Sequence, residues 1–266
     1  MVEQHSSILD RGEPAAVVNL DGASPFLFVC EHSSNHIPAA LGNLGLDEAT
    51  LSSHIAWDIG AAALSKRLSE AFDAPLVVQR YSRLAYDCNR SSFSPEAIPA
   101  LIERVAVPGN AGLSESDRQA RIEQIYLPFH ARISNLIDQR VRRGRETVLV
   151  TVHSFTPVFM GVRRVVDLGV LHDADRQLSD VILSLAARAR EYIVKRIQPY
   201  GPSDGVTHTL LLHGIGRGIK NAMLKVRNDH IEGKDGQIVW ADRLAMLLQE
   251  AHDVTEISPN LKARCI

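Results

Sequence analysis

The sequence predicts an α/β fold, a three-layer αβα sandwich around a mostly parallel, mixed central sheet. Short apolar runs alternate along the chain with longer segments of helical spacing, which is the pattern of strands and helices in layered α/β proteins. Several of these runs are apolar at nearly every position, as expected of strands covered on both faces. With 266 residues and 45% hydrophobic content, the chain can bury a substantial core.

The first third of the chain supplies two predicted strands and one helix. Residues 1–22 are largely polar and are expected to form an N-terminal arm, which precedes a single domain over residues 23–266. Apolar runs bounded by turn residues predict strands over 25–30 and 74–82. Between them, residues 47–72 place apolar side chains at helical intervals and predict one helix.

The remainder begins with a long amphipathic helix predicted over residues 115–143. Pro128 should kink or divide it, because proline lacks the N–H of a helical hydrogen bond and clashes with the preceding turn. The glycine-rich segment 201–219 is expected to be a loop region. The other predicted elements are strands over 146–155, 165–171 and 221–229, and helices over 174–197 and 236–252.

Composition favours a protein that acts on a small molecule. Lys plus Arg total 29 against 31 for Asp plus Glu, and no basic run interleaved with aromatic residues indicates nucleic acid. No apolar run approaches the roughly 18 residues of a membrane span, and no signal-peptide pattern begins the chain. Three widely spaced cysteines fit a reducing compartment. We therefore expect a cytoplasmic protein without nucleic-acid or membrane partners; the oligomeric state stays open.

Four predicted strands end in clusters of polar side chains. The exits read EHSSNH, YDCNR, TVHSF and VRNDH. In parallel sheets the carboxyl ends of neighbouring strands meet at one edge, where ligands bind. The residues expected to surround one pocket there are His32, Asp58, Asn89, Arg90, His153 and Arg227.

Two of these residues, His32 and His153, are of the type that holds zinc. Neutral imidazoles from adjacent strands are common zinc ligands, and a catalytic zinc usually takes a third protein ligand while leaving a position for water. Taken alone, a histidine after a strand is more often an ordinary hydrogen-bonded surface or core group than a metal ligand. The EHSSNHIP segment could likewise be a turn that hydrogen-bonds its own backbone.

The segments EHSSNHIP, HIAWDIGA, DCNR and VHSFTP together resemble the N-formylglutamate amidohydrolase family, over about residues 25–250. The resemblance implies a zinc-carboxypeptidase-like fold and hydrolysis of the amide of an N-acyl amino acid such as N-formylglutamate. It implies Zn²⁺ or another divalent metal as cofactor and a small acidic substrate. It also places His32, Asp58 and His153 at metal-ligand positions, with Glu31 or Asn35 as alternatives for the third ligand.

The DCNR segment resembles the Asn-Arg pair with which carboxypeptidase-like enzymes hold their substrate. Arg90 would grip a carboxylate through two parallel hydrogen bonds, and Asn89 would supplement it. A structural ion pair between Arg90 and Asp87 is the simpler alternative. Candidates for binding a second substrate carboxylate are Arg83, Arg163 and Arg227.

One position departs from the family pattern. Family members usually read E-x-R-N-D at the last strand, and that glutamate would be the base that activates water. Here Lys225 stands at the glutamate position. An ammonium group cannot accept a proton, so lysine could act as a base only if burial lowered its pKa enough to make it a neutral amine. Other acid–base candidates are His213, Glu31 and Asp229. Lys225 also favours an alternative, a non-catalytic or altered relative that binds an acidic small molecule; hydrolysis of a different linkage is a third possibility.

Overall fold

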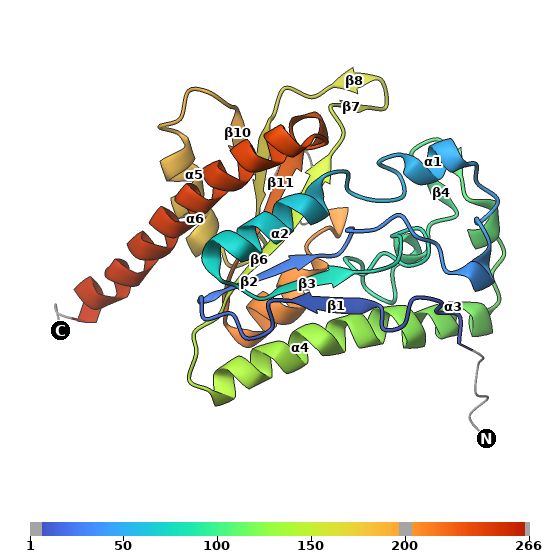
Figure 1. Cartoon of the computed structure of the whole chain (residues 1–266), viewed down its shortest axis with the longest axis horizontal. Helices are drawn as coiled ribbons and strands as arrows, with labels where there is room; N and C mark the ends of the chain where they lie inside the picture. Colours follow the sequence, from blue (N-terminus) through green and yellow to red (C-terminus); the bar gives the residue numbers. More distant parts are fainter. Residues whose placement is uncertain (1–6, 197–203, 264–266) are drawn as a thin grey trace.

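A mixed seven-stranded sheet lies between two helical layers in the computed structural model, which describes residues 7–196 and 204–263 (Figure 1). Its strands are β1 (Ala15–Val18), β2 (Phe26–Cys30), β3 (Leu76–Gln79), β6 (Val148–Phe155), β9 (Leu168–Leu171), β10 (Val194–Arg196) and β11 (Lys220–Arg227). The strand order is β1-β3-β2-β6-β11-β9-β10. The central strands β3, β2, β6 and β11 run parallel, whereas β1 and β9 pair antiparallel with β3 and β11. The predicted fold class is confirmed.

The two central strands explain the apolar runs of the sequence. Every residue of β2 and β6 is buried, so neither face needs polar side chains. Alternate residues of β2 point into different cores. Phe26, Phe28 and Cys30 face one, and Leu27 and Val29 face the other.

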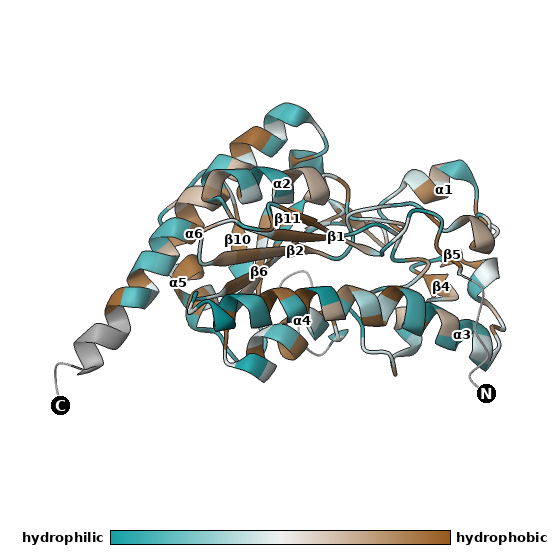
Figure 2. Ribbon diagram, turned by 60° about the horizontal axis from the view of Figure 1, so that its bottom comes forward, coloured by the Kyte–Doolittle hydropathy of each residue, from teal (hydrophilic) through white to brown (hydrophobic). Residues whose placement is uncertain are grey.

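Helices cover both faces of the sheet, as Figure 2 shows with the apolar strands between two amphipathic layers. One layer contains α2 (Ala61–Phe72), α5 (Gln177–Ala186) and α6 (Lys234–Ala263). The other contains α4 (Leu127–Arg142), whose buried side chains include Phe129, Ile133 and Ile137. No helix in the described part of the chain is both long enough and apolar enough to cross a membrane.

Pro128 interrupts the predicted long helix where the sequence indicated. Helix α3 (Glu115–Arg121) is joined to α4 by a π-helical turn at Ile122–Tyr126, and Pro128 stands in the first turn of α4. In the π-helical turn the amide of Leu127 donates to the carbonyl of Ile122, five residues earlier, so the regular hydrogen-bond ladder is already rearranged next to the proline, which has no N–H to donate. The π-helical turn accommodates the change between the two helices.

The helix predicted over residues 47–72 is wrong as a single element. The structure has α1 (Glu48–Ser52), an irregular segment over 53–60, and then α2. Gly60 precedes α2 with φ of +79°, and a Cβ there would clash with the carbonyl oxygen of Ile231. A left-handed backbone at this point favours glycine and breaks the helical path. The break places Asp58 in a turn.

Three further expectations differ from the structure. The helix predicted over 174–197 ends at Ala186, and its last part forms β10 beside β9; residue 197 lies outside the described residues. The segment 201–219 contains a π-helical turn, Leu210–Gly214, and a 3₁₀ turn, Ile215–Arg217, where a loop was predicted. Within the expected N-terminal arm, β1 joins the sheet edge.

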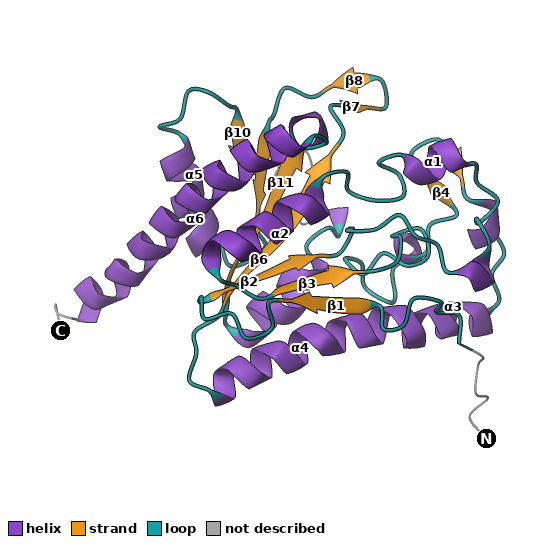
Figure 3. Cartoon of the chain, viewed as in Figure 1, coloured by secondary structure: helices purple, strands orange, loops and turns teal. Residues whose placement is uncertain are grey.

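Short elements complete the structure (Figure 3). Two hairpins leave the main sheet, β4–β5 (Leu101–Ile102 and Val105–Ala106) and β7–β8 (Val158–Phe159 and Val162–Arg163). The remaining 3₁₀ turns are Ala39–Leu41, Pro95–Ala97, Pro108–Asn110 and Asn228–His230. Cys30 and Cys88 are buried thiols without a disulfide, and Cys265 lies outside the described residues.

Candidate metal centre and active site

Polar side chains from four strand ends and one turn gather at one edge of the sheet. His32 is the second residue after β2, Asp87 lies in the loop after β3, and His153 and Lys225 are near the ends of β6 and β11. Because these four strands are parallel, their carboxyl ends lie side by side. Asp58 reaches the same edge from the turn before α2.

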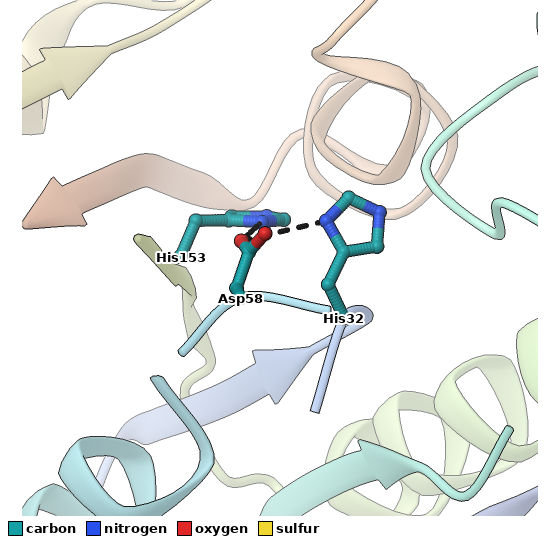
Figure 4. A group of neighbouring side chains, drawn as sticks. All are labelled: His32, Asp58 and His153. Carbon is teal, nitrogen blue, oxygen red and sulfur yellow. Dashed lines mark hydrogen bonds and ion pairs between the residues drawn. The ribbon is translucent and has the colours of Figure 1, made fainter. Parts of the chain in front are cut away.

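His32, Asp58 and His153 meet around one point (Figure 4). Asp58 Oδ2 lies 3.4 Å from Nδ1 of His32 and 2.9 Å from Nδ1 of His153. The two imidazole rings are 5.0 Å apart between centroids. One potential ligand atom from each residue lies within 4.8 Å of the others, a spacing compatible with one shared ion at bond lengths of ~2 Å.

A buried carboxylate stands behind each imidazole. Asp87 Oδ1 is 2.7 Å from Nε2 of His32, and Glu31 Oε2 is 3.1 Å from Nε2 of His153. Asp87 is hydrogen-bonded to Nε2 of His32, an arrangement that keeps the proton on Nε2 and leaves Nδ1 as the electron-pair donor, whereas Glu31 is an ion-pair neighbour of His153 without a hydrogen bond. Both Nδ1 atoms face Asp58. These roles of Asp87 and Glu31 were not predicted, since the strand exits indicate proximity without specific pairs.

The charges around the two rings are strongly coupled. Burial alone would raise the pKa of Asp58, but His32 and His153 hold it well below its ordinary value. Burial alone would lower the pKa of His153, but Glu31 and Asp58 raise it. Despite burial, the pKa of Glu31 is lowered by His153. The three carboxylates at this edge, Glu31, Asp58 and Asp87, are therefore anionic at neutral pH.

This donor set fits a divalent metal. Two imidazoles and one carboxylate are a common ligand combination for catalytic zinc. His32, Asp58 and His153 are all at most 5% exposed, and Nδ1 of His32 is a buried nitrogen that makes no hydrogen bond with any described residue. A buried group of this kind needs a partner. A dication would also offset the excess of buried carboxylates.

A cavity of about 290 Å³ adjoins these residues and is lined by Asp58, Arg83, Arg90 and Lys225 among others. Arg83 forms ion pairs with Asp87 at 3.0 Å and Asp58 at 3.6 Å. Arg90 is 2.9 Å from Glu96 Oε2 and also donates to the carbonyl of Asp204. Its Nε is 4.0 Å from Asp87, so the alternative of an Arg90–Asp87 pair is present in a weak form.

Three of the predicted substrate-binding residues lie off the cavity: Arg163, which is exposed on β8, and Asn89 and Arg227. Asn89 is 2% exposed, donates to the carbonyl of Val206 and accepts from the amide of Thr209, so it fixes the backbone that follows residue 204. Arg227 is paired with Asp167 at 3.0 Å and Asp229 at 2.8 Å. None of the three belongs to the cavity lining.

The predicted acid–base residues are separated by the fold. Lys225 lines the cavity, stands beside His153 in the register of β6 and β11, and has a pKa that burial lowers to about 8. Glu31 is fully buried behind His153. His213 lies in the turn Leu210–Gly214, where its Nε2 is 2.9 Å from Nδ1 of His130 on α4. Glu31 and His213 are not among the residues that line the cavity, and their catalytic roles stay predictions.

A second group of metal-type side chains, Glu146, His252 and Glu256, has a different electrostatic situation. Lys220 Nζ is 3.1 Å from Glu146 Oε1 and also bonds Glu256. The ammonium group thus already supplies a cation to these two carboxylates, whereas a metal would have to displace it.

Comparisons with known proteins identify the family and the fold. The model of the N-formylglutamate amidohydrolase family matches residues 24–232, whereas no curated protein matches the chain. The crystal structure of a gene product from Agrobacterium tumefaciens is 46% identical, with a TM-score of 0.91 over 92% of this chain and 97% of that one. An N-formylglutamate amidohydrolase from Ralstonia eutropha is 18% identical, with a TM-score of 0.63 over 91% of this chain and 99% of that one, and shares the fold.

Proposed function

The chain belongs to the N-formylglutamate amidohydrolase family, and from this premise we propose that it is a metal-dependent hydrolase of the amide bond in N-acyl amino acids, with N-formylglutamate as the reference compound. The observation that carries the proposal is the arrangement of His32 and His153. Each imidazole has a buried carboxylate at Nε2, and both present Nδ1 to the same oxygen of Asp58.

His32, His153 and Asp58 would hold Zn²⁺ or another divalent metal. Such an ion, when bound, polarises an amide carbonyl and lowers the pKa of water towards about 7. Asp87 and Glu31 would fix the rotation and protonation of the two rings. Arg83, which is paired with both Asp58 and Asp87, would keep these two carboxylates in place.

Arg90 is the group proposed to orient the substrate through its α-carboxylate. Its present partner Glu96 has a side chain that is 62% exposed, so Glu96 can return to water when a substrate carboxylate replaces it. A guanidinium fork bonds a carboxylate at two oxygens and so fixes its direction. This anchoring would place the amide at the metal end of the cavity, beside Asp58 and Lys225.

Lys225 is the proposed proton donor to the leaving amine, because it lines the cavity next to His153. A positioned acid at this point makes the amine a better leaving group. Lys225 also supports the second candidate function, in which this protein binds an acidic small molecule without cleaving it. In that case the ammonium group would pair with the ligand, and the base that family members carry here would be missing.

Metal analysis combined with a turnover assay tests the proposal. The purified protein should contain about one divalent ion per chain and release amino acid from N-formylglutamate or from other N-acyl amino acids. Asp58→Asn should lose both properties. Asp167→Asn is the matched control, because Asp167 also pairs with a histidine, His230, but does not line the cavity. A protein that binds no divalent metal under any loading condition would refute it.

Lys225→Glu separates the two candidates. If Lys225 donates a proton, the variant should turn over substrate more slowly than the natural protein. If turnover appears or rises only in the variant, the natural protein is the binder.

A further inference from the structure

Apolar side chains from three segments form much of the cavity wall away from the metal residues. They include Trp57, Leu101, Ile102, Phe155 and Phe159. Leu101 and Ile102 belong to the β4–β5 hairpin and Phe159 to the β7–β8 hairpin, and these two hairpins lie apart in the fold (Figure 1). Leu101 is 64% exposed. Apolar surface left open inside a binding cavity gains free energy when an apolar ligand group covers it.

The charged side chains that line this wall are acidic, whereas Arg164, with its guanidinium carbon 4.4 Å from the centroid of the Phe159 ring, is not among the lining residues. Glu103 closes the β4 end and is 2.9 Å from His54, and Glu96 stands beside Arg90. A second carboxylate on the substrate would approach these acids, and like charges held close together repel. Glu103 also has φ of +54°, so its position is set by a constrained backbone turn.

The cations that line the cavity are engaged elsewhere, and Arg164 donates to the carbonyl of Thr156 while it covers the Phe159 ring. Arg90 is required for the α-carboxylate, and Arg83 is engaged by Asp58 and Asp87. Lys225 stands beside His153 at the metal end, where the amide must lie, so a substrate side chain that points to the hairpins does not meet it. Arg227, expected as a partner for a second carboxylate, is paired with Asp167 and Asp229 off the cavity.

From this distribution we infer that the site selects N-acyl amino acids with an apolar side chain, which packs between the two hairpins, and disfavours the second carboxylate of N-formylglutamate. The inference rests on the proposed function for the position of the amide and of the α-carboxylate. It concerns only the subsite formed by Trp57 and the two hairpins.

The test compares the N-formyl derivatives of norleucine, glutamine and glutamate, three side chains of similar length that differ in polarity and charge. Equilibrium binding and kcat/KM are both measured. Norleucine should be preferred over glutamate by roughly tenfold or more, with glutamine between them, the range that one pocket contact commonly gives. Phe159→Ala should reduce the norleucine preference several-fold, whereas Val162→Ala, on the same hairpin but outside the cavity lining, should leave it unchanged.

Binding keeps this inference separate from the proposed function. Tighter binding of the norleucine derivative without any turnover would support the apolar subsite and refute the hydrolase. Equal or tighter binding of the glutamate derivative would overturn the subsite even if all three compounds are hydrolysed. A preference that is unchanged in Phe159→Ala would overturn it as well.

Discussion

Two groups of buried histidines in this molecule differ in what surrounds them. In the candidate metal centre, His32 and His153 each contact a buried carboxylate and share Asp58. Between the sheet and α4, His130 contacts His213 at 2.9 Å and the carbonyl of Cys88 at 2.9 Å, and His208 bonds the hydroxyl of Tyr126.

The two environments give opposite electrostatics. Glu31 and Asp58 raise the pKa of His153 against the effect of burial, whereas burial lowers the pKa of His130 well below its usual range and that of His213 to about 4. Burial is therefore common to both groups, and the carboxylates make the difference. Only the first group combines two imidazoles with a shared carboxylate, the arrangement that the proposed metal requires, whereas His130 bonds only its neighbours.

Replacing a histidine of the metal centre should have the largest effect. In His153→Ala the centre loses one of two imidazole donors, and we expect loss of bound metal with a decrease in kcat/KM of about 10³-fold or more. Metal content per chain and initial rates measure this. His130→Ala serves as the matched variant and should retain its metal. Full metal content in His153→Ala would contradict the difference proposed between the two histidine groups.

The same His130→Ala variant should lose stability. His130 is 5% exposed and bonds both His213 and the carbonyl of Cys88. Its removal leaves a cavity and unpaired polar groups, so the free energy of unfolding should fall by about 2–4 kcal/mol. Urea denaturation measures the change. A difference below about 0.5 kcal/mol, the size of a typical surface substitution, would contradict a packing role.

Acidification should lower the free energy of unfolding through the histidines beside α4. Unfolded histidine binds a proton near pH 6.5, whereas His213 in the folded chain does so at about pH 4. Between these values the unfolded state binds more protons, so stability falls as the pH falls, by up to about 3 kcal/mol for this group. Denaturation midpoints between pH 7 and pH 4 measure the slope. In His213→Leu the slope should be shallower; an equal slope would assign it to other groups.

Removing one outer carboxylate should have an intermediate effect on the metal centre. Asp87→Asn keeps a side chain of the same shape near Nε2 of His32 but removes its charge. We expect metal affinity to fall about 10- to 100-fold, as for other outer partners of ligating histidines. Competition with a chromophoric chelator measures the affinity. Unchanged affinity would mean that the carboxylates do not distinguish the two histidine groups.

The sequence predicted the sheet better than the turns. Continuous apolar runs identified β2 and β6 because both faces of these strands are covered, and polar strand ends indicated the edge where His32 and His153 meet. The turn that carries Asp58 was not predicted, because residues 47–72 keep helical spacing and the break depends on contact between Gly60 and Ile231. The partners of Arg227 and His213 were also not predictable, since they depend on the direction in which the backbone points each side chain.

The contact between Gly60 and Ile231 also affects how variants of this chain should be read. Gly60 supplies no ligand atom to the candidate metal centre. Any side chain at this position would nevertheless clash with the backbone of Ile231, which follows β11. The adjoining turn holds Asp58, which accepts from the amide of Ser154, while Ile59 accepts from the Ser154 hydroxyl. A search limited to chemically active residues would overlook Gly60. The direction of the Asp58 carboxylate depends on the absence of a side chain at this glycine.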